Sequence, residues 1–333
     1  MSKILTSSQR DAARRGAQPT FMSPMLARLT RKRFSDDGWI YERKLDGERC
    51  LAVVKGGTVS LFSRNRRNLS PVYPEIVDQL DEDGATGYIV DGEIVAFSGN
   101  RTSFSRLQQR MGIEDPDEAR SSPVAVYYYV FDVMFADGHD LCGLPLAERK
   151  RVLKKLLAFS NRVRWTPYRR GDGEAYYHEA CRKGWEGVIA KRLDASYRHS
   201  RSSDWLKFKC VNQQELVIGG YTDPEGSRIG FGALLVGYYE KGELRYAGKV
   251  GTGYDEETLR SLTEKLTRHE RKSCPFANSD EIKERRPHWV SPKLVGQFGF
   301  TEWTGDGKLR HPRFLGLRQD KPPKQVRREQ SKG

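Results

Sequence analysis

The chain has 333 residues, 37% of them hydrophobic, which suffices for two folded domains or one large one, and its net charge of +14 favours a polyanionic partner. No apolar run approaches the ~18 residues of a membrane span, and the N-terminus lacks the apolar core of a secretory signal, although its arginines leave an organelle transit peptide as an alternative. The five cysteines form no CxxC pair and the six histidines do not cluster, so we expect neither a disulfide framework nor a structural zinc site, and a reducing cytoplasm fits best.

The N-terminal arm carries much of the excess charge. Residues 1–33 hold eight Lys or Arg against one acid, a net charge of +7 and half of the total excess. We expect roughly the first 20 residues to be mobile, because unanchored chain ends are usually poorly ordered. Residues 1–24 are therefore treated as a basic arm ahead of the first folded domain.

Residues 25–211 are expected to form a mixed α+β domain with antiparallel strand pairs. Two β-rich runs, 51–54 and 58–62, flank Lys55-Gly56-Gly57, which is typical of a hairpin. A second pair of runs flanks Asp91-Gly92, and we interpret that dipeptide as a turn as well. Further strands are expected at 124–135, 186–191 and 205–209, and helices at 146–159 and 173–183.

Residues 212–321 are expected to form a small OB-fold β-barrel. Short strands with glycine turns, at 215–221, 233–240 and 243–250, accompany one helix at 255–268. The domain boundary is placed at 210–214. The last residues, 322–333, are expected to form a basic, frayed tail.

A candidate nucleophile lies in residues 42–49, with the sequence ERKLDGER. Lys44 is expected in a turn beside Gly47, which presents the side chain instead of packing it. The flanking cations Arg43 and Arg49 oppose protonation of the amine, and a lowered pKa would make Lys44 nucleophilic. Taken alone, a short pattern of this kind is more often a surface turn.

Two further segments follow in the order that nucleotidyl transfer requires. Residues 63–68, with the sequence SRNRRN, form a basic loop that suits phosphate contacts through Arg64 and Arg66, or a solvated hairpin end. Glu93 follows Asp91-Gly92 and offers a carboxylate to ribose hydroxyls, although the segment by itself is only a turn.

Three expected strands carry residues that could serve the same site. Phe131 could stack on a purine, although core packing is the commoner role, and Asp132 beside it has no evident partner. Glu186, at the end of its strand, could hold a divalent cation. Period-two alternation puts Lys207 and Lys209 on one face, which favours an anion such as a triphosphate between them, or a solvated basic strand.

The order of these segments, KLDGER, SRNRRN, DGE, FD, EGVIAK and WLKFK, resembles motifs I to V of the covalent nucleotidyltransferase superfamily. That superfamily comprises DNA ligases, RNA ligases and mRNA capping enzymes. Residues 103–108, 248–253 and 311–318 resemble the bacterial ATP-dependent DNA ligases called LigC and the ligase domain of LigD. The resemblance covers residues 20–325 and implies an adenylation (nucleotidyltransferase) domain with antiparallel sheets, followed by an OB-fold domain.

The resemblance implies a role around the nucleotide for each of five residues. Lys44 would attack the α-phosphate of ATP, and Glu42 would lie near the adenine, mainly through its backbone. Arg49 and Glu93 would contact the sugar and phosphate, while Phe131 would stack on the adenine.

Other residues are implied to act on the metal ion and the phosphates. Glu186, with Glu93, would hold Mg²⁺ or Mn²⁺. Lys207 and Lys209 would meet the α-phosphate and neutralise the charge that develops there.

The resemblance also implies a final motif and a DNA contact. Arg318, Asp320 and Lys321 would swing over ATP and orient the pyrophosphate for departure. Arg64 and Arg66 would bind the phosphate of the nicked strand. The OB-fold domain would first close on ATP and then rotate to grip DNA.

The implied activity is that of an ATP-dependent DNA ligase that seals 5′-phosphate/3′-hydroxyl nicks in double-stranded DNA, in repair or end joining. Such an enzyme would act as a monomer at the nucleoid of a bacterial cytoplasm, away from membranes. A Ku-like end-binding protein or a repair polymerase would be a candidate partner. An RNA ligase and a GTP-using capping enzyme are alternatives on the same scaffold, and a non-catalytic nucleic-acid-binding protein is an alternative of another class.

The sequence departs from the related pattern in two places. Arg66-Arg67 stand where many relatives have a glycine-containing turn, which puts the geometry of that loop in doubt. No large N-terminal DNA-encircling domain, polymerase region or phosphoesterase region is expected. We hypothesise that the basic arm, residues 1–33, partly replaces the encircling domain.

Overall fold

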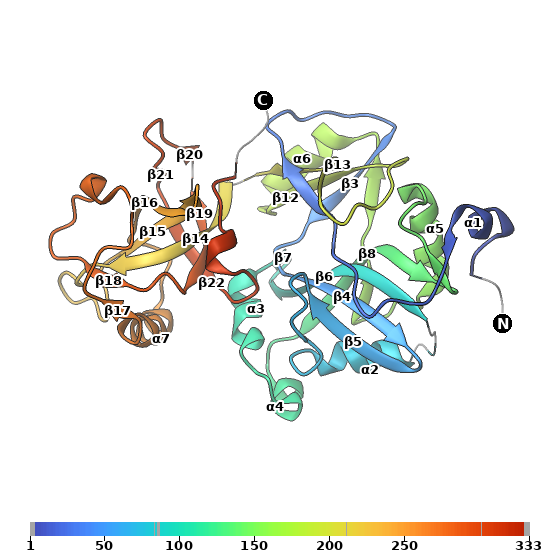
Figure 1. Ribbon diagram of the computed structural model, residues 1–333, viewed down its shortest axis with the longest axis horizontal. Helices are drawn as coiled ribbons and strands as arrows, with labels where there is room; N and C mark the ends of the chain where they lie inside the picture. The colour runs from blue at the N-terminus through green and yellow to red at the C-terminus, as the bar shows by residue number, and fades with distance from the viewer. Residues whose placement is uncertain (1–3, 83, 85–86, 211, 301, 330–333) are drawn as a thin grey trace. The chain divides into compact units, whose positions relative to one another are not determined.

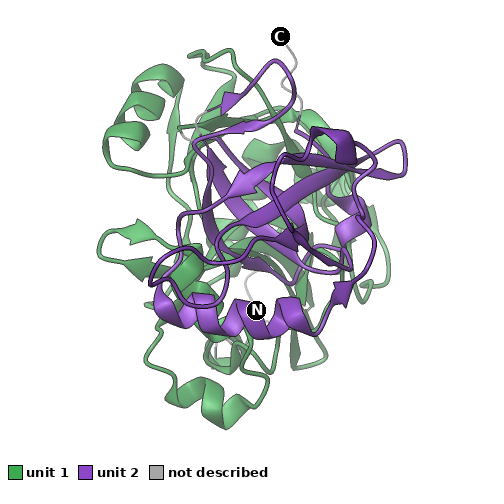
Figure 2. Ribbon diagram, turned by 90° about the vertical axis from the view of Figure 1, so that its left-hand side faces the viewer, with its two compact units in different colours: residues 1–210, 331–333 green, residues 211–330 purple. Residues whose placement is uncertain are grey.

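The computed structural model describes residues 4–82, 84, 87–210, 212–300 and 302–329. The chain divides into two compact units, Met1–Cys210 with Ser331–Gly333 and Val211–Gln330, which Figure 2 distinguishes by colour. Both units combine largely antiparallel sheets with helices, so the predicted α+β class is confirmed. Within the described residues, no helix is long and apolar enough to cross a membrane.

Among its described residues, the first unit contains an eight-stranded and a five-stranded sheet (Figure 1). The main path of the large sheet runs β1 (Arg14–Arg15), β9 (His139–Asp140), β8 (Val126–Ala136), β6 (Tyr88–Ser98), β4 (Glu48–Lys55) and β5 (Thr58–Ser63), with β10 (Val163–Trp165) beside β8 and β7 (Arg101–Thr102) beside β6. The small sheet runs β11 (Tyr168–Arg170), β3 (Trp39–Lys44), β12 (Gly187–Arg192), β13 (Arg201–Lys209) and β2 (Leu26–Leu29). Its strands β2 and β13 are parallel.

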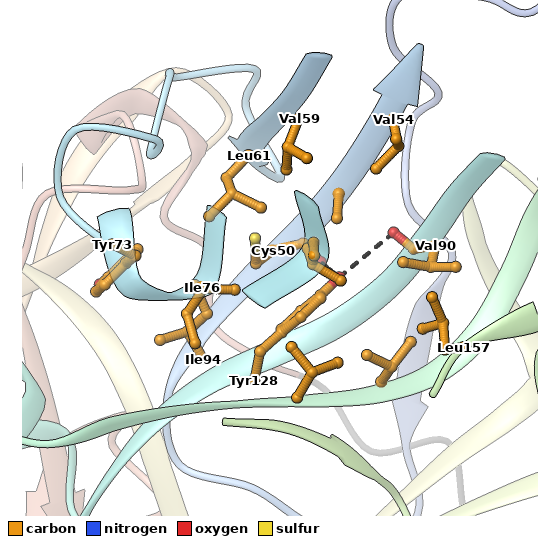
Figure 3. Packing of buried hydrophobic residues seen from close by; sticks show 14 of the residues in the cluster. Cys50, Val54, Val59, Leu61, Tyr73, Ile76, Val90, Ile94, Tyr128 and Leu157 are labelled. Atoms are coloured by element: carbon orange, nitrogen blue, oxygen red, sulfur yellow. Dashed lines mark hydrogen bonds between the residues drawn. The ribbon is translucent and has the colours of Figure 1, made fainter. Parts of the chain in front are cut away.

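Alternation along the strands gives the large sheet two buried faces. One face packs against helices α2 (Pro74–Glu82), α3 (Phe104–Met111) and α5 (Leu146–Leu156) and forms the main hydrophobic core. Figure 3 shows part of this core around Tyr128, whose hydroxyl donates to the carbonyl of Cys50 at 3.0 Å. A second core joins this sheet to the small one through residues such as Leu51, Phe131 and Trp205. The candidate site borders this second core.

Asp91-Gly92 is not a turn, so that prediction was wrong. Both residues lie inside the continuous strand β6, and no turn separates the two apolar runs. Asp91 is fully buried because Arg49 and Tyr197 bind its carboxylate. Gly92 is required for packing, since a Cβ there would lie 2.4 Å from the ring of Tyr128. The polar dipeptide therefore marks a tertiary contact instead of a chain reversal.

The described part of the N-terminal arm is packed against the first unit, contrary to the expected mobility. Leu5 is only 1% exposed and belongs to the main core. The short helix α1 (Ser7–Ala12) follows it, and Arg14 and Arg15 then pair with β9. Apolar packing, the strand pairing and hydrogen bonds such as that from Gln9 to Glu148 thus anchor a segment whose composition suggested a free tail. Deletion of residues 1–20 would disturb the fold as well as any nucleic-acid contact.

The second unit is built on a curved antiparallel sheet and is an OB-fold, as predicted. Its sheet runs β16 (Glu243–Val250), β15 (Leu234–Glu240), β14 (Asn212–Tyr221), β18 (His288–Val290) and β17 (Glu270–Arg271), with β19 (Val295–Phe300) joining β14 to β22 (Arg313–Arg318). A separate pair is formed by β20 (Glu302–Trp303) and β21 (Leu309–Arg310). The predicted helix is α7 (Glu256–Thr267), and its leucines pack into the core of this unit.

The C-terminal tail was expected to be frayed, but its described residues pack on the second unit. Val326 is fully buried, and its carbonyl accepts a hydrogen bond from the amide of Tyr239 at 2.8 Å. Glu329 donates its amide to Gln214 at 2.9 Å. The remainder of the predicted tail, 330–333, lies outside the described residues. The buried valine and these hydrogen bonds fix a segment that is otherwise basic.

Cys181 and Cys210 form a disulfide, which the sequence analysis did not expect. Their Cα atoms are 5.1 Å apart although 29 positions separate them in the chain. Helix α6 (Gly173–Arg182) packs on β12, and β12 pairs with β13, so the end of α6 comes beside the residue that follows β13. The spacing of the two cysteines carries no sign of this proximity, because only the packing of α6 on the small sheet creates it.

Asp132 has a partner that its sequence position did not reveal. Arg149, on the buried face of α5, donates from Nε to Oδ1 at 2.8 Å and from Nη2 to Oδ2 at 3.0 Å. Both side chains are fully buried. The amide of Val133 donates to the same carboxylate at 2.9 Å, so the charge of Asp132 is satisfied in an otherwise apolar strand.

We predict that Arg149→Met lowers the free energy of unfolding by about 3–5 kcal/mol, because it leaves Asp132 buried without its counter-ion. Urea unfolding followed by fluorescence measures the loss. The control is Arg120→Met, which breaks an exposed pair with Asp78 and should cost at most about 1 kcal/mol. Equal losses of unfolding free energy in the two variants would show that burial of the Arg149–Asp132 pair does not determine its contribution to stability.

Candidate active site

Three neighbouring strands of the small sheet end side by side at the candidate site (Figure 1). Gly187 on β12 is in register with Lys44 on β3 and with Lys209 on β13. A Cβ on Gly187 would lie 2.0 Å from the carbonyl oxygen of Phe208, and the φ of this residue is 150°. Only glycine permits this approach, so the row of Lys44, Gly187 and Lys209 depends on it.

Alternation places several of the candidate residues on one face of the small sheet. Lys207 and Lys209 lie on the face of β13 opposite to Phe208, which is buried against α6. The register through β12 carries that face across to Glu42 and Lys44 on β3. Glu42 and Lys44 thus lie on the same side of the sheet as Lys207 and Lys209, although more than 160 positions separate the two pairs in the chain.

Lys44 forms an ion pair with Glu186. Its Nζ lies 2.7 Å from Oε2 of Glu186, and the carboxylate is only 6% exposed. Burial lowers the pKa of Lys44, but Glu186, with smaller effects of Glu93 and Asp46, outweighs burial and raises it. The expectation of a lowered pKa was therefore wrong, since Glu186 favours the protonated form of Lys44.

Arg43 occupies the face of β3 opposite to Lys44. Its guanidinium carbon lies 4.4 Å from the ring centroid of Trp185 and 5.9 Å from that of Phe97. Burial lowers the pKa of Arg43 itself. Strand alternation separates two cations that are adjacent in the sequence.

Arg49 is held by Asp91 in the large sheet. Its Nε and Nη2 each donate to one carboxylate oxygen of Asp91 at 2.5 Å, and the hydroxyl of Tyr197 donates to the same carboxylate at 2.6 Å. Burial lowers the pKa of Arg49, but the opposing effect of Asp91 is larger and raises the pKa above its usual value. The guanidinium therefore remains charged. Glu93 is in register with Arg49 on the neighbouring strand. The structure therefore places both residues on the face that borders the small sheet.

Phe131 lies between the two sheets and is 8% exposed. The guanidinium carbon of Arg49 is 4.8 Å from its ring centroid, and Nζ of Lys191 is 4.0 Å from it. Lys191 Nζ is also 4.0 Å from the ring of Trp205. Aromatic faces thus border the buried cations at this point, as cation–π attraction favours.

Glu42 is shared between two buried lysines. Lys150 Nζ donates to its Oε1, and Lys191 Nζ lies 2.7 Å from its Oε2. All three side chains are at most 3% exposed. Burial lowers the pKa of Lys191 to about 8, since one carboxylate cannot fully compensate two ammonium groups. The side chain of Glu42 is therefore committed to these lysines.

Neither Lys191 nor Lys150 was predicted from the sequence to have a role in the site. A signal for Lys150 was present, because Leu146, Lys150 and Leu153 recur with the spacing of one helix face. A lysine on the apolar stripe of a helix indicates a buried partner. The partner itself, Glu42, is 108 positions away and could not be identified from that spacing.

The loop after β5 presents Arg64 and Arg66. It closes tightly, since the amide of Arg66 donates to the carbonyl of Ser63 at 2.9 Å and the amide of Ser63 donates to that of Arg67 at 2.9 Å. Arg66 is exposed and has a φ of 65°, in the left-handed region that favours glycine. Arg66 therefore adopts a backbone conformation that glycine would adopt without strain.

Arg318, Asp320 and Lys321 belong to the second unit and are tied together within it. Arg318 donates from Nε and Nη2 to the two carboxylate oxygens of Asp320, each at 2.8 Å. Lys321 Nζ donates to Oε2 of Glu215 at 2.9 Å. The final motif is thus a pre-ordered ionic cluster at the end of β22.

A divalent cation fits the donor set near Lys44 only together with further ligands. Among the described residues, no group of three or more His, Cys, Asp or Glu is placed to hold a metal ion. Mg²⁺ commonly binds through one or two carboxylates, water and substrate phosphates. Glu186 and Glu93 supply two carboxylates that act on Lys44, so the residues suit a cation that arrives with a nucleotide.

Two family models match the chain. One, described as "ATP dependent DNA ligase domain", matches residues 24–209. The other, described as "ATP dependent DNA ligase C terminal region", matches residues 227–321. A solved structure, "mycobacterial DNA ligase D complexed with ATP and MES", is similar with a TM-score of 0.68 and 33% identity, and the match covers 92% of this chain and 98% of that one.

Curated relatives extend the comparison. The chain is 35% identical over 322 residues to the "Multifunctional non-homologous end joining protein LigD" of Pseudomonas aeruginosa, which covers 95% of this chain and 37% of that protein. It is 36% identical to the protein of the same name from Mycobacterium bovis, covering 92% and 40%. A "DNA ligase" of Pyrobaculum neutrophilum is 30% identical, covering 86% and 54%. The chain therefore spans well under two thirds of the length of these relatives.

We predict that Lys44 reacts with an amine-selective acylating reagent only at alkaline pH, because its raised pKa leaves little neutral amine near neutrality. Glu186→Gln removes the carboxylate that raises the pKa, so the midpoint of the reactivity curve should move to lower pH. Peptide mass mapping across a pH series measures both curves. Glu118→Gln, at an exposed position on α4 (Pro116–Ser121), should leave the midpoint unchanged. A Glu186→Gln midpoint equal to that of the parent would refute the electrostatic explanation.

We predict that Arg66→Gly is more stable than Arg66→Ala by about 1 kcal/mol, because only the glycine adopts a positive φ without strain. Both variants lose the same guanidinium, so their difference isolates the backbone effect. Thermal unfolding of the two variants side by side provides the measurement. An alanine variant as stable as the glycine variant would show that the loop relaxes out of the left-handed conformation.

Proposed function

Because this chain belongs to the ATP-dependent DNA ligase family, we propose that it seals nicks in double-stranded DNA through an AMP group carried covalently on Lys44. The observation that supports this most directly is the row of Lys44, Gly187 and Lys209, with Glu186 bound to Lys44 at 2.7 Å. The row presents an amine nucleophile, a carboxylate and a second cation at one end of one sheet. That arrangement suits attack on a phosphate that must be positioned and neutralised.

The first step transfers AMP from ATP to the enzyme. Lys44 must lose its proton, and Glu186 must give up its contact with the amine before attack. The Lys44 nitrogen then forms a bond to the α-phosphorus, while the bond from that phosphorus to the bridging oxygen breaks and pyrophosphate leaves. Lys207 and Lys209, on the same face, balance the negative charge that develops on the α-phosphate.

Glu186 and Glu93 are the residues that would hold Mg²⁺ or Mn²⁺ with the nucleotide. The cation, when bound, would neutralise phosphate charge as a Lewis acid. Phe131 and the backbone of Glu42 border the space assigned to the adenine, and Arg49 borders the sugar. Arg318, Asp320 and Lys321 would orient the pyrophosphate when the second unit closes on ATP.

The second and third steps act on DNA. The 5′-phosphate of the nick attacks the phosphorus of the lysyl-AMP, which breaks the nitrogen–phosphorus bond and frees Lys44. The 3′-hydroxyl then attacks the activated 5′-phosphate, forms the phosphodiester and releases AMP. Arg64 and Arg66 would bind the phosphate of the nicked strand, and the second unit would rotate from its ATP-bound arrangement to grip DNA.

The cellular role that fits this activity is DNA repair by end joining, at the nucleoid of a bacterial cytoplasm. The printed names of two relatives refer to non-homologous end joining. A Ku-like end-binding protein or a repair polymerase would bring the enzyme to a break, and the net charge of +14 would favour DNA association by counterion release. We propose that the enzyme acts as a monomer.

The alternatives differ in nucleotide and in chemistry. An RNA ligase would prefer a nick with ribonucleotide ends, and a capping enzyme would form a GMP adduct. A non-catalytic binding protein would form no adduct at all. The family match favours the DNA ligase over each of these.

The proposal predicts one AMP adduct on Lys44 after incubation with ATP and Mg²⁺, and none with GTP or NAD⁺. Lys44→Ala should abolish the adduct, because Lys44 is the proposed nucleophile and its amine is the one bound to Glu186 in the row beside Gly187. Intact mass with peptide mapping, on protein checked for pre-bound AMP, is the measurement. Lys183→Ala, at an exposed position, is the control and should retain the adduct. A GMP adduct would indicate a capping enzyme. An AMP adduct on the Lys44→Ala variant would overturn the assignment of Lys44 as the nucleophile.

A further inference from the structure

The disulfide between Cys181 and Cys210 lies where the two units join. Strand β13 ends at Lys209 and β14 begins at Asn212, so only positions 210 and 211 separate the last strand of the first unit from the first strand of the second. Cys210 is the first of these two positions. The disulfide therefore attaches Cys210, one of the two connecting residues, covalently to α6.

The disulfide also encloses the residues proposed to serve the phosphates. Glu186, Lys207 and Lys209 all lie in the 29-residue segment that the Cys181–Cys210 bond closes. The amide of Cys210 donates to the carbonyl of Glu186 at 3.0 Å, which ties the connection to the strand end that carries the carboxylate. Strand pairing holds these site residues in place independently, since β12 and β13 pair along five residues in register. The bond therefore restrains the connection more than the site.

Resting on the function proposed above, we propose that Cys181–Cys210 is a reversible thiol–disulfide switch that restrains the connection between the units and slows the change from the ATP-bound to the DNA-bound arrangement. A change between two arrangements is absorbed by the backbone torsions of a few connecting residues. The bond to Cys181 fixes Cys210 on α6 and so limits the change of backbone torsion at this connecting residue. After reduction, Cys210 keeps its backbone hydrogen bond to Glu186 and its packing against the cluster around Phe208, but it loses its covalent attachment to α6.

The chemistry of the switch is thiol–disulfide exchange. A thiolate of a dithiol reductant attacks one sulfur, the Cys181–Cys210 bond breaks, and a mixed disulfide forms. The second thiol of the reductant then displaces the remaining cysteine, so both cysteines end as thiols and the reductant ends as a disulfide. The reverse reaction uses a low-molecular-weight disulfide as oxidant. Both cysteines are half-buried, which leaves them open to small reagents, whereas Cys50 and Cys142 are buried.

The test compares the oxidised and reduced full chain in two assays. Repeated sealing of a nick with ATP and Mg²⁺ requires both arrangements in every cycle, whereas sealing of a chemically pre-adenylated nick by AMP-free enzyme requires only the DNA-bound one. We expect reduction to raise the rate of repeated sealing by about threefold or more and to leave the pre-adenylated reaction unchanged within about twofold. Peptide mapping must show the Cys181–Cys210 bond in the oxidised sample and free thiols in the reduced one.

Variants separate the switch from other effects of oxidation. Cys181→Ser should behave like the reduced protein in either condition, and Cys274→Ser, which removes a free cysteine of the second unit, should retain the full response. Hydrogen exchange at the amide of Cys210, which lies beyond the pairing of β12 with β13, should increase on reduction of the parent and should already be high in Cys181→Ser. A redox response that persists in Cys181→Ser, an equal response of the pre-adenylated reaction, or two free thiols after oxidation would overturn the switch. No sealing in either redox state would instead refute the proposed function.

Discussion

The site depends on the close approach of three strand ends at Gly187. Because a Cβ there would meet the carbonyl oxygen of Phe208 at 2.0 Å, any larger residue would push β13 away from β12. The same register that requires glycine places Lys44 and Lys209 on its two sides and brings Glu186, the preceding residue, to the amine of Lys44. A nucleophile and a charge-balancing cation from segments over 160 positions apart are thereby fixed by backbone pairing. Rigid strands suit this purpose better than loops, since phosphoryl transfer relies on positioned charge.

Around this row, buried cations are balanced only in part. Arg49 has a full counter-ion in Asp91, whereas Lys150 and Lys191 share the single carboxylate of Glu42. The aromatic faces of Phe131 and Trp205 stabilise Lys191 without neutralising it. The first unit thus holds a preformed surplus of positive charge beside the nucleophile, which is the electrostatic environment that a polyphosphate requires. Glu186 favours the protonated form of Lys44, so the same carboxylate that would serve a metal ion also restrains the nucleophile.

The sequence predicted the α+β class and the OB-fold of the second unit, and its apolar patterns indicated elements such as α5 and the hairpin of β4 and β5. The predictions failed where specific tertiary contacts outweighed the overall composition of a segment. Leu5 anchors a basic arm, Val326 anchors a basic tail, and Tyr128 fills the space that Gly92 leaves inside a strand. In each case, a few specific tertiary contacts decided that a polar or basic segment is packed within the fold. The composition of a segment describes its average character and therefore does not show which of its residues make specific contacts.

The sequence by itself determined which segments could carry the chemistry, because Lys44, Glu186, Lys207 and Lys209 stand at strand ends or alternate with apolar residues, and alternation is a local property. Only the tertiary structure decided their charge states and partners. It raised the pKa of Lys44 where neighbouring cations predicted a lower one, paired Asp132 with Arg149, and joined Cys181 to Cys210. The physical reason is common to all three. A side chain's pKa, ion pairing and covalent bonding depend on distances of a few ångströms between residues that are remote in the chain, and strand and helix packing alone sets those distances.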